Sequence, residues 1–156
     1  MPDVSELLPQ RPPFLMVDSV LGYGAGNSQT LVAAYAVSGS DPVFADGYSP
    51  THWPSVHVVE GLGQSCQILS LLGHRDRPVA DDSPGDTGVP RAPSFAPPGL
   101  LAAVDVEIHG FAKPGDRLRY HVTQTHALDE LFRFRATAYV KERMIASGVM
   151  VGAVMR

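Results

Sequence analysis

The sequence predicts an α+β domain in which an antiparallel sheet of about six strands wraps round one long central helix. Three observations predict this class. A single stretch, residues 55–73, carries apolar residues at helical spacing. Four later stretches alternate apolar and polar residues, which is typical of half-buried strands. Two apolar runs separated by glycines precede the helix and indicate a strand–turn–strand unit.

Three elements precede the helix: one helical turn over residues 3–8 and two strands over residues 14–21 and 30–37. Asp3 or Ser5 can cap the helical turn, and the prolines that follow end it. Between the strands, residues 22–27 place glycines where a turn with positive φ is expected. Their G-x-G-x-G spacing is weak evidence for a dinucleotide site, because a strand rather than a helix follows.

The central helix has Pro54 at its start and Gly73 at its end. Gly61 and Gly63 lie inside it, where each glycine costs about 1 kcal/mol relative to alanine, so we expect another backbone to cross closely there. Residues 75–99 are rich in Pro, Gly and Asp without periodicity, and they predict a long mobile loop.

Four strands follow, centred on residues 104–108, 118–122, 132–136 and 144–155. Lys113-Pro114-Gly115-Asp116 and Lys141-Glu142-Arg143 provide turn chemistry between them. The chain of 156 residues therefore predicts one domain, residues 1–156.

Composition excludes several classes of protein. Hydrophobic residues make up 44% and charged residues 18%, as expected of a globular chain. The net charge of −4 argues against nucleic-acid binding, which needs a strongly basic surface. No window is apolar enough to span a membrane and the N-terminus does not resemble a signal peptide, so we expect no membrane partner and a cytoplasmic location. A single cysteine, Cys66, and no metal-ligand spacing indicate neither a disulfide framework nor a metal site.

Three motifs, in order, resemble those of the FabZ-like 3-hydroxyacyl-[acyl-carrier-protein] dehydratases. Residues 8–18, LPQRPPFLMVD, resemble the opening L-P-H-R-x-P-F-L-x-V-D. Residues 53–64, WPSVHVVEGLGQ, are similar to the helix start M-P-G-V-L-I-I-E-A-L-A-Q. Residues 113–118, KPGDRL, are similar to the turn V-P-G-D-x-L. The motifs cover nearly the whole chain apart from residues 75–99.

The resemblance implies a hotdog fold and a dimer whose two active sites lie in acyl tunnels at the interface. It implies a lyase without a cofactor, which removes water from 3-hydroxyacyl thioesters on acyl carrier protein in fatty-acid or polyketide assembly. This chemistry needs a base for the α-proton, an acid for the departing hydroxyl and dipoles at the thioester oxygen. In the family a His is the base, a Glu or Asp from the partner chain is the acid, and a backbone N–H at the helix start polarises the carbonyl. Glu60 falls on the acidic position.

The motif that carries the family's catalytic His, H-F-P-G-H-P-V-M-P-G, is degenerate here. Counting back from Glu60 places this His on Asp46, and counting forward from residues 42–44 places it on Gly47. The glycine that supplies the backbone N–H is replaced by Ser55, a change that keeps the N–H.

Three interpretations remain open. In the first interpretation the chain is the base-deficient half of a heterodimer whose partner has an intact His motif. In the second, His52 or His57 replaces the base, and the chain forms a homodimer. In the third interpretation the chain is an acyl thioesterase or a non-catalytic acyl-binding subunit.

His57, Glu60, Gln64 and Gln67 have the spacing of one helix face, and a polar stripe on a buried helix requires partners. We therefore predict Glu60, His57 and His52 as catalytic residues. The residues that we expect to bind the substrate flank them: Trp53, Ser55, Val56 and Gln64.

The resemblance implies two macromolecular partners, acyl carrier protein and a second hotdog subunit. Carrier proteins are acidic, so a basic patch is needed on this chain despite its net charge. Its candidate residues are Arg11, Lys113, Arg117, Arg119, Arg133 and Arg135.

Overall fold

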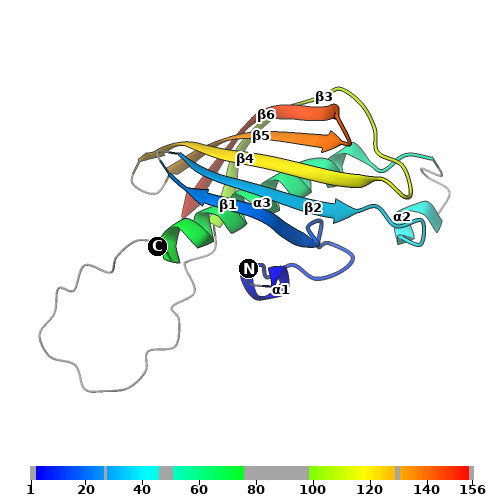
Figure 1. Ribbon diagram of the computed structural model, residues 1–156, viewed down its shortest axis with the longest axis horizontal. Coiled ribbons are helices and arrows are strands. Elements are labelled where there is room, and N and C mark those ends of the chain that lie inside the picture. Colours follow the sequence, from blue (N-terminus) through cyan, green and yellow to red (C-terminus); the bar gives the residue numbers. More distant parts are fainter. Residues whose placement is uncertain (1–2, 27, 46–50, 76–98, 129–130, 155–156) are drawn as a thin grey trace, which may run out of the picture.

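The computed structural model describes residues 3–26, 28–45, 51–75, 99–128 and 131–154. The helices are α1 (Val4–Leu7), α2 (Pro42–Ala45) and α3 (Ser55–Arg75). The strands are β1 (Ser19–Ala25), β2 (Gln29–Ala36), β3 (Gly99–Ile108), β4 (Arg117–Leu128), β5 (Leu131–Val140) and β6 (Arg143–Val154). The strands form one six-stranded antiparallel sheet in the order β1-β2-β4-β5-β6-β3. Figure 1 shows this sheet lying over α3, so the predicted arrangement of sheet and helix is confirmed.

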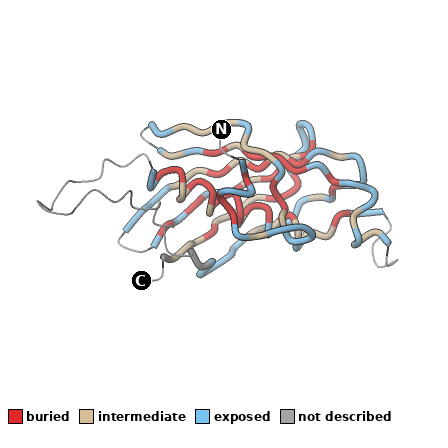
Figure 2. Tube along the Cα trace, turned by 90° about the horizontal axis from the view of Figure 1, so that it is seen from below, coloured by how far each residue is buried: buried red, intermediate tan, exposed pale blue. Residues whose placement is uncertain are grey.

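The core lies between α3 and the inward face of the sheet. Figure 2 shows buried residues concentrated through the middle of the molecule, with exposed residues at its edges. On α3 the buried apolar side chains include Leu62, Cys66 and Leu69, which recur every three or four residues. On β5 every second residue from Phe132 to Val140 is buried, as the alternating pattern predicts.

The first strand differs from its prediction. The sequence predicts a strand over residues 14–21 and a glycine turn over residues 22–27, but β1 runs from Ser19 to Ala25 and contains Gly22 and Gly24. Residues 14–16 bond instead to a side chain of α3, through Gln64. The pairing of β1 with β2 shifts register between Val20 and Gly22, and a glycine accommodates such an irregularity within a strand.

The expectation of a backbone crossing at the helix glycines is also wrong. A Cβ atom added at Gly61 would collide with the ring and hydroxyl of Tyr120, a side chain of β4. A Cβ atom at Gly63 would meet only the side chains of Met150 and Leu101, at 3.7 and 3.8 Å. The close approach therefore occurs at one glycine, and an aromatic side chain makes it.

The connections behave largely as the turn chemistry predicts. Gly115 has φ +89°, and Asp116 accepts a hydrogen bond from the N–H of Lys113 across the turn before β4. Lys141, at φ 54°, begins the two-residue turn between β5 and β6. Helix α3 continues two residues beyond its predicted end, to Arg75. The predicted loop begins there and ends at Gly99, and residues 76–98 between them lie outside the described residues.

Candidate functional site

A backbone hydrogen bond of Trp53 fixes the start of α3 to the rest of the fold, and a second bond lies within its first turn. The backbone N–H of Trp53 donates to the carbonyl of Ala112 at 2.8 Å, and the N–H of His57 donates to the carbonyl of Pro54 at 3.0 Å. Ser55 is half-buried as the first helical residue, and Val56 is 67% exposed. The predicted substrate-binding residues Trp53, Ser55 and Val56 therefore lie together at this helix end.

Glu60 and Gln64 lie one turn apart on α3 and are joined by a hydrogen bond. The carboxamide Nε2 of Gln64 donates to Oε1 of Glu60 at 2.8 Å and to the carbonyl of Phe14 at 2.7 Å. Its Oε1 accepts from the N–H of Met16 at 2.8 Å. Gln64 is buried while Glu60 is exposed. Gln64 therefore orients an exposed carboxylate and also attaches the segment before β1 to the helix.

The start of α3 and strand β3 carry apolar side chains that are exposed in the described part of the chain. We call this the α3–β3 surface, and its exposed side chains are Val56, Leu101, Val104 and Ile108. Leu101 approaches α3 beside Gly63, which follows Glu60 by three residues and so shares its face of the helix. Strand β3 forms one edge of the sheet, so its outer backbone edge has no neighbouring strand within the described chain.

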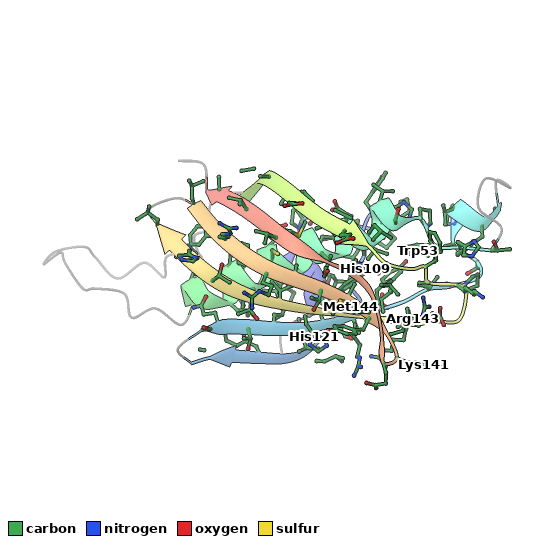
Figure 3. The ribbon with its side chains drawn as sticks, turned by 90° about the horizontal axis from the view of Figure 1, so that it is seen from above. Trp53, His109, His121, Lys141, Arg143 and Met144 are labelled. Atoms are coloured by element: carbon green, nitrogen blue, oxygen red, sulfur yellow. The ribbon has the colours of Figure 1, made fainter. Side chains whose placement is uncertain are left out.

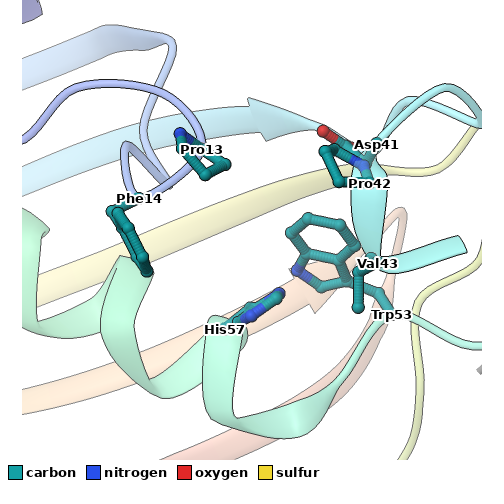
Figure 4. A pocket seen from close by; sticks show the side chains of 7 residues that line it. All are labelled: Pro13, Phe14, Asp41, Pro42, Val43, Trp53 and His57. Carbon is teal, nitrogen blue, oxygen red and sulfur yellow. The ribbon is translucent and has the colours of Figure 1, made fainter. Parts of the chain in front are cut away.

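Trp53 forms the floor of a small open pocket beside the start of α3. Its side chain is 2% exposed, and its ring packs against those of Tyr35, Phe44 and His57 at centroid separations of 5.4, 5.7 and 4.8 Å. The pocket has a volume of about 170 Å³. We call it the Trp53 pocket, and it is lined by Pro13, Phe14, Asp41, Pro42, Val43, Trp53 and His57 (Figure 4).

Two side-chain nitrogens at this pocket are buried without a hydrogen-bond partner in the described structure. They are Nε1 of Trp53 and Nδ1 of His57. Burial lowers the pKa of His57 below its usual range, and the carboxylates of Asp41 and Glu60 oppose this shift only in part. The imidazole of His57 is therefore neutral at pH 7.

His52 has a different environment from His57. It is exposed, its Nδ1 is 2.7 Å from the hydroxyl of Thr51, and its ring packs on Phe111 at 5.0 Å. The two positions where the family motif would place a His, Asp46 and Gly47, lie outside the described residues.

None of the remaining histidines lines the Trp53 pocket. His74 is in the last turn of that helix, His109 is 2.7 Å from the hydroxyl of Ser147, and His121 packs on Tyr139. His126 is exposed near the end of β4. Figure 3 labels His109, just after the end of β3, and His121, on β4.

Cys66 is a buried thiol that contacts the sulfur of Met150 at 3.9 Å, and burial raises its pKa. It therefore acts as a core residue. Among the described residues there is no group of three or more His, Cys, Asp or Glu side chains placed to hold a metal ion. In the same residues no helix is both long enough and apolar enough to cross a membrane.

The six basic candidates divide into two groups. Arg11 donates to the carbonyls of Leu8 and Gln10, and Arg119 donates to the carbonyl of Lys141. The other four residues, Lys113, Arg117, Arg133 and Arg135, are exposed, as is Arg11. Arg133 and Arg135 alternate with the buried residues of β5 and so lie on the outward face of the sheet.

The sequence did not identify Phe14 and Asp41 as neighbours of His57. Phe14 belongs to the motif of residues 8–18 and Asp41 to no motif, and their positions opposite α3 depend on how separate segments of the chain pack. The Asp41 carboxylate accepts from the N–H of Ser38 at 3.1 Å, which fixes it at the margin of the Trp53 pocket.

Comparison with known proteins gives relatives along nearly the full chain. A protein of Dechloromonas aromatica named 3-hydroxyacyl-[acyl-carrier-protein] dehydratase FabZ is 30% identical over 154 residues, which cover 97% of this chain and 94% of the relative. A protein of the same name from Nitratiruptor sp. is 29% identical over 148 residues, covering 92% of this chain and 89% of the relative. No protein-family model matches the chain.

Among solved structures, the dehydratase heterocomplex ApeI:P from Xenorhabdus doucetiae matches with a TM-score of 0.73 at 16% identity. The match covers 100% of this chain and 93% of that one. At this level of identity the likeness concerns the fold, and it confirms the hotdog arrangement that the motifs imply.

Proposed function

We propose, from the premise that the chain belongs to the FabZ family of 3-hydroxyacyl-[acyl-carrier-protein] dehydratases, that it takes part in dehydrating 3-hydroxyacyl thioesters. The substrate is carried on acyl carrier protein during fatty-acid or polyketide assembly. The chain acts as one subunit of a hotdog dimer, to which it contributes Glu60 as the acid. The buried, unpaired thiol of Cys66 is compatible with a reducing cytoplasm, where we place the protein.

The reaction removes a proton from Cα of the acyl group and breaks the bond between Cβ and the hydroxyl oxygen. The electron pair of the Cα–H bond forms the double bond, and the departing hydroxyl takes a proton from the Glu60 carboxyl to leave as water. Negative charge accumulates on the thioester oxygen before the C–O bond breaks. The backbone N–H groups at the start of α3, among them that of Val56, are free of helical partners and point along the helix axis toward such a charge.

The observation that carries this proposal is the placement of Glu60. Its side chain is exposed and is oriented by the buried carboxamide of Gln64. Three residues further along α3, Gly63 lies beside Leu101 of the exposed α3–β3 surface. A second hotdog subunit that covers this surface would remove both the apolar side chains and Glu60 from water. The acid would then lie in an apolar channel between two chains, where a proton-transfer group is most effective.

The base comes from the second subunit in this proposal. Neither Asp46 nor Gly47 can supply an imidazole, and the ring of His57 is packed against Trp53 in the Trp53 pocket. His52 contacts Thr51 and Phe111. A partner hotdog chain with an intact H-F-P-G motif supplies the missing base, which fits the description of the structural relative as a heterocomplex.

Acyl carrier protein is the proposed source of the substrate. Its acidic surface is complementary to exposed cations on this chain, of which Lys113, Arg117, Arg133 and Arg135 make no ion pair within the described residues. Rim contacts of this kind mainly raise the association rate and weaken with salt.

The test is an assay of the purified chain, alone and mixed with a hotdog chain that bears H-F-P-G and comes from the same organism. We expect no elimination by the chain alone, and elimination from 3-hydroxyacyl thioesters by the mixture above the rate of the partner alone. Glu60→Gln should remove this gain. Glu142→Gln is the matched control, because that carboxylate is 98% exposed on the β5–β6 turn, and it should retain the gain.

Two results contradict the proposal. Free acid released from plain acyl thioesters would assign a thioesterase, with Glu60 activating water. No turnover by the chain alone on either substrate, together with no gain over the rate of the partner alone in the mixture, would assign a non-catalytic acyl-binding subunit.

A further inference from the structure

Strand β3 is a long edge strand that the described chain leaves almost entirely exposed. It lies at one edge of the six-stranded sheet, beside β6 (Figure 1). From Leu101 to Ile108 every residue except half-buried Val106 is exposed. The strand at the opposite edge, β1, is shorter, contains two glycines and is largely half-buried. An exposed apolar edge such as that of β3 is a site for pairing with a strand of another chain.

The two faces of β3 carry side chains of different character. Val104 pairs with the buried Met150 of β6, so Val104 and Ile108, four residues further on, lie on the inward face of the sheet. Asp105 and Glu107 alternate with them on the outward face, and both are exposed. Within the described residues neither carboxylate makes an ion pair. An incoming strand therefore meets apolar side chains on one face of β3 and two negative charges on the other.

Pairing of β3 with the same strand of a second copy would bring like charges together. In an antiparallel pair with a two-fold axis, residues at equal distances from the axis lie opposite each other. An axis at Val106 pairs Val104 of each copy with Ile108 of the other, and so covers the exposed apolar side chains. The same register places Asp105 of each copy directly opposite Glu107 of the other. Two carboxylate pairs then oppose self-pairing, because like charges in directly opposite positions are destabilising.

We propose that Asp105 and Glu107 select the partner of this chain: they disfavour a second copy and favour a different hotdog chain whose edge strand carries Lys or Arg on its outward face. This inference rests on the proposed function, which requires a second hotdog subunit. With such a partner the apolar contacts of the inward face are kept, while the outward row changes from like to opposite charges. The charge on one strand thus makes the mixed dimer more stable than a pair of identical chains.

Charge reversal on β3 tests this selection in the full chain. In a self-paired dimer, Glu107→Lys replaces the two like-charge pairs by two opposite-charge pairs with Asp105. We expect its self-association, measured by sedimentation velocity over a range of concentrations, to be about tenfold tighter than that of the parent chain. A double variant that combines Asp105→Lys with Glu107→Lys restores like charges, now positive, and should self-associate no more tightly than the parent chain.

Glu142→Lys is the matched control, because it makes the same change of charge at a carboxylate that is 98% exposed on the β5–β6 turn. It should self-associate like the parent chain. A second measurement determines the affinity of each protein for the hotdog chain that bears H-F-P-G. The parent chain and Glu142→Lys should bind this partner equally well, and Glu107→Lys should bind it about tenfold more weakly.

Three results would overturn the charge selection. They are self-association of the parent chain as tight as that of Glu107→Lys, self-association of the double variant as tight as that of Glu107→Lys, and equal affinity of the parent chain and Glu107→Lys for the partner. All three leave the role of Glu60 standing, since neither measurement involves turnover. Conversely, if Glu60→Gln keeps the full gain in the mixed assay, the proposed function fails while the charge selection on β3 is unaffected.

Discussion

Replacing Gly61 by alanine tests the packing that holds α3 against the sheet. Two opposing contributions set the expected change in the free energy of unfolding. Alanine in place of glycine within a helix is favourable by about 1 kcal/mol. Against this, the added Cβ atom would collide with the hydroxyl and ring of Tyr120, a fully buried side chain. Overpacking of this kind costs about 1–3 kcal/mol, and a rigid ring with no space to move belongs at the upper end. We expect a net loss of about 2 kcal/mol.

Gly63→Ala is the matched control on the same helix. Its Cβ atom would lie at ordinary contact distances of 3.7 and 3.8 Å from Met150 and Leu101, so only the helical gain remains. We expect this variant to be more stable than the parent chain by about 0.5–1 kcal/mol. Urea unfolding of the three proteins, followed by far-ultraviolet circular dichroism, measures both changes.

The source of the clash can be tested in a second background. Tyr120→Leu removes the colliding atoms, and in that variant Gly61→Ala should lose most of its cost. Tyr120→Phe removes only the hydroxyl, and because the ring carbon Cζ also collides, the cost should persist. Equal stabilities of Gly61→Ala and Gly63→Ala would refute the packing described here.

Three other predictions concern the site and its supports. Gln64→Met should lower the free energy of unfolding by about 2–4 kcal/mol in urea titrations, because it leaves the buried N–H of Met16 unsatisfied. Gln67, which is half-buried on the same helix, is the control, and Gln67→Met should change the free energy of unfolding by about 0.5 kcal/mol or less. Equal effects of the two substitutions would contradict the role of Gln64. Gly115→Ala should lower the free energy of unfolding by about 1–2 kcal/mol, because the backbone of Gly115 has φ +89°. No atom lies near enough to the added Cβ to clash with it, so the loss comes from the backbone conformation alone. An unchanged midpoint of urea unfolding would show that the turn relaxes. Since the pKa of His57 is lowered in the folded chain, the unfolded chain binds more protons as pH falls through about 6.5, and stability is lost in that direction. The melting temperature should therefore fall less between pH 7.5 and 5.5 in His57→Leu than in the parent chain, and identical slopes would argue against a buried neutral imidazole.

Much of the fold follows from local patterns in the sequence. Alternation along β5 and helical spacing along α3 predict these elements because each has one face on the core. The first strand could not be placed in this way, since residues 14–16 are held by hydrogen bonds to Gln64, which is distant in sequence. The apolar run fits a strand that begins at residue 14 as well as one that begins at Ser19. Only the position of α3 decides which of these residues enter the sheet.

The candidate site shows the same division. Helical spacing brings His57, Glu60 and Gln64 to one region of α3, but it does not distinguish their environments. In the structure Gln64 is buried, Glu60 is exposed and His57 turns toward Trp53. The Trp53 pocket combines three segments that are far apart in the chain, so no spacing rule could predict it.

A complementation assay tests most directly whether Glu60 completes an active site whose base is on another chain. The partner hotdog chain is first made inactive by replacing its own motif Glu with Gln, with its His left intact. Mixed with this protein, it should regain dehydration of a 3-hydroxyacyl thioester, and it should not regain it when mixed with Glu60→Gln. Equal recovery with the parent chain and with Glu60→Gln, or no recovery from a mixture in which the two chains copurify, would contradict the account.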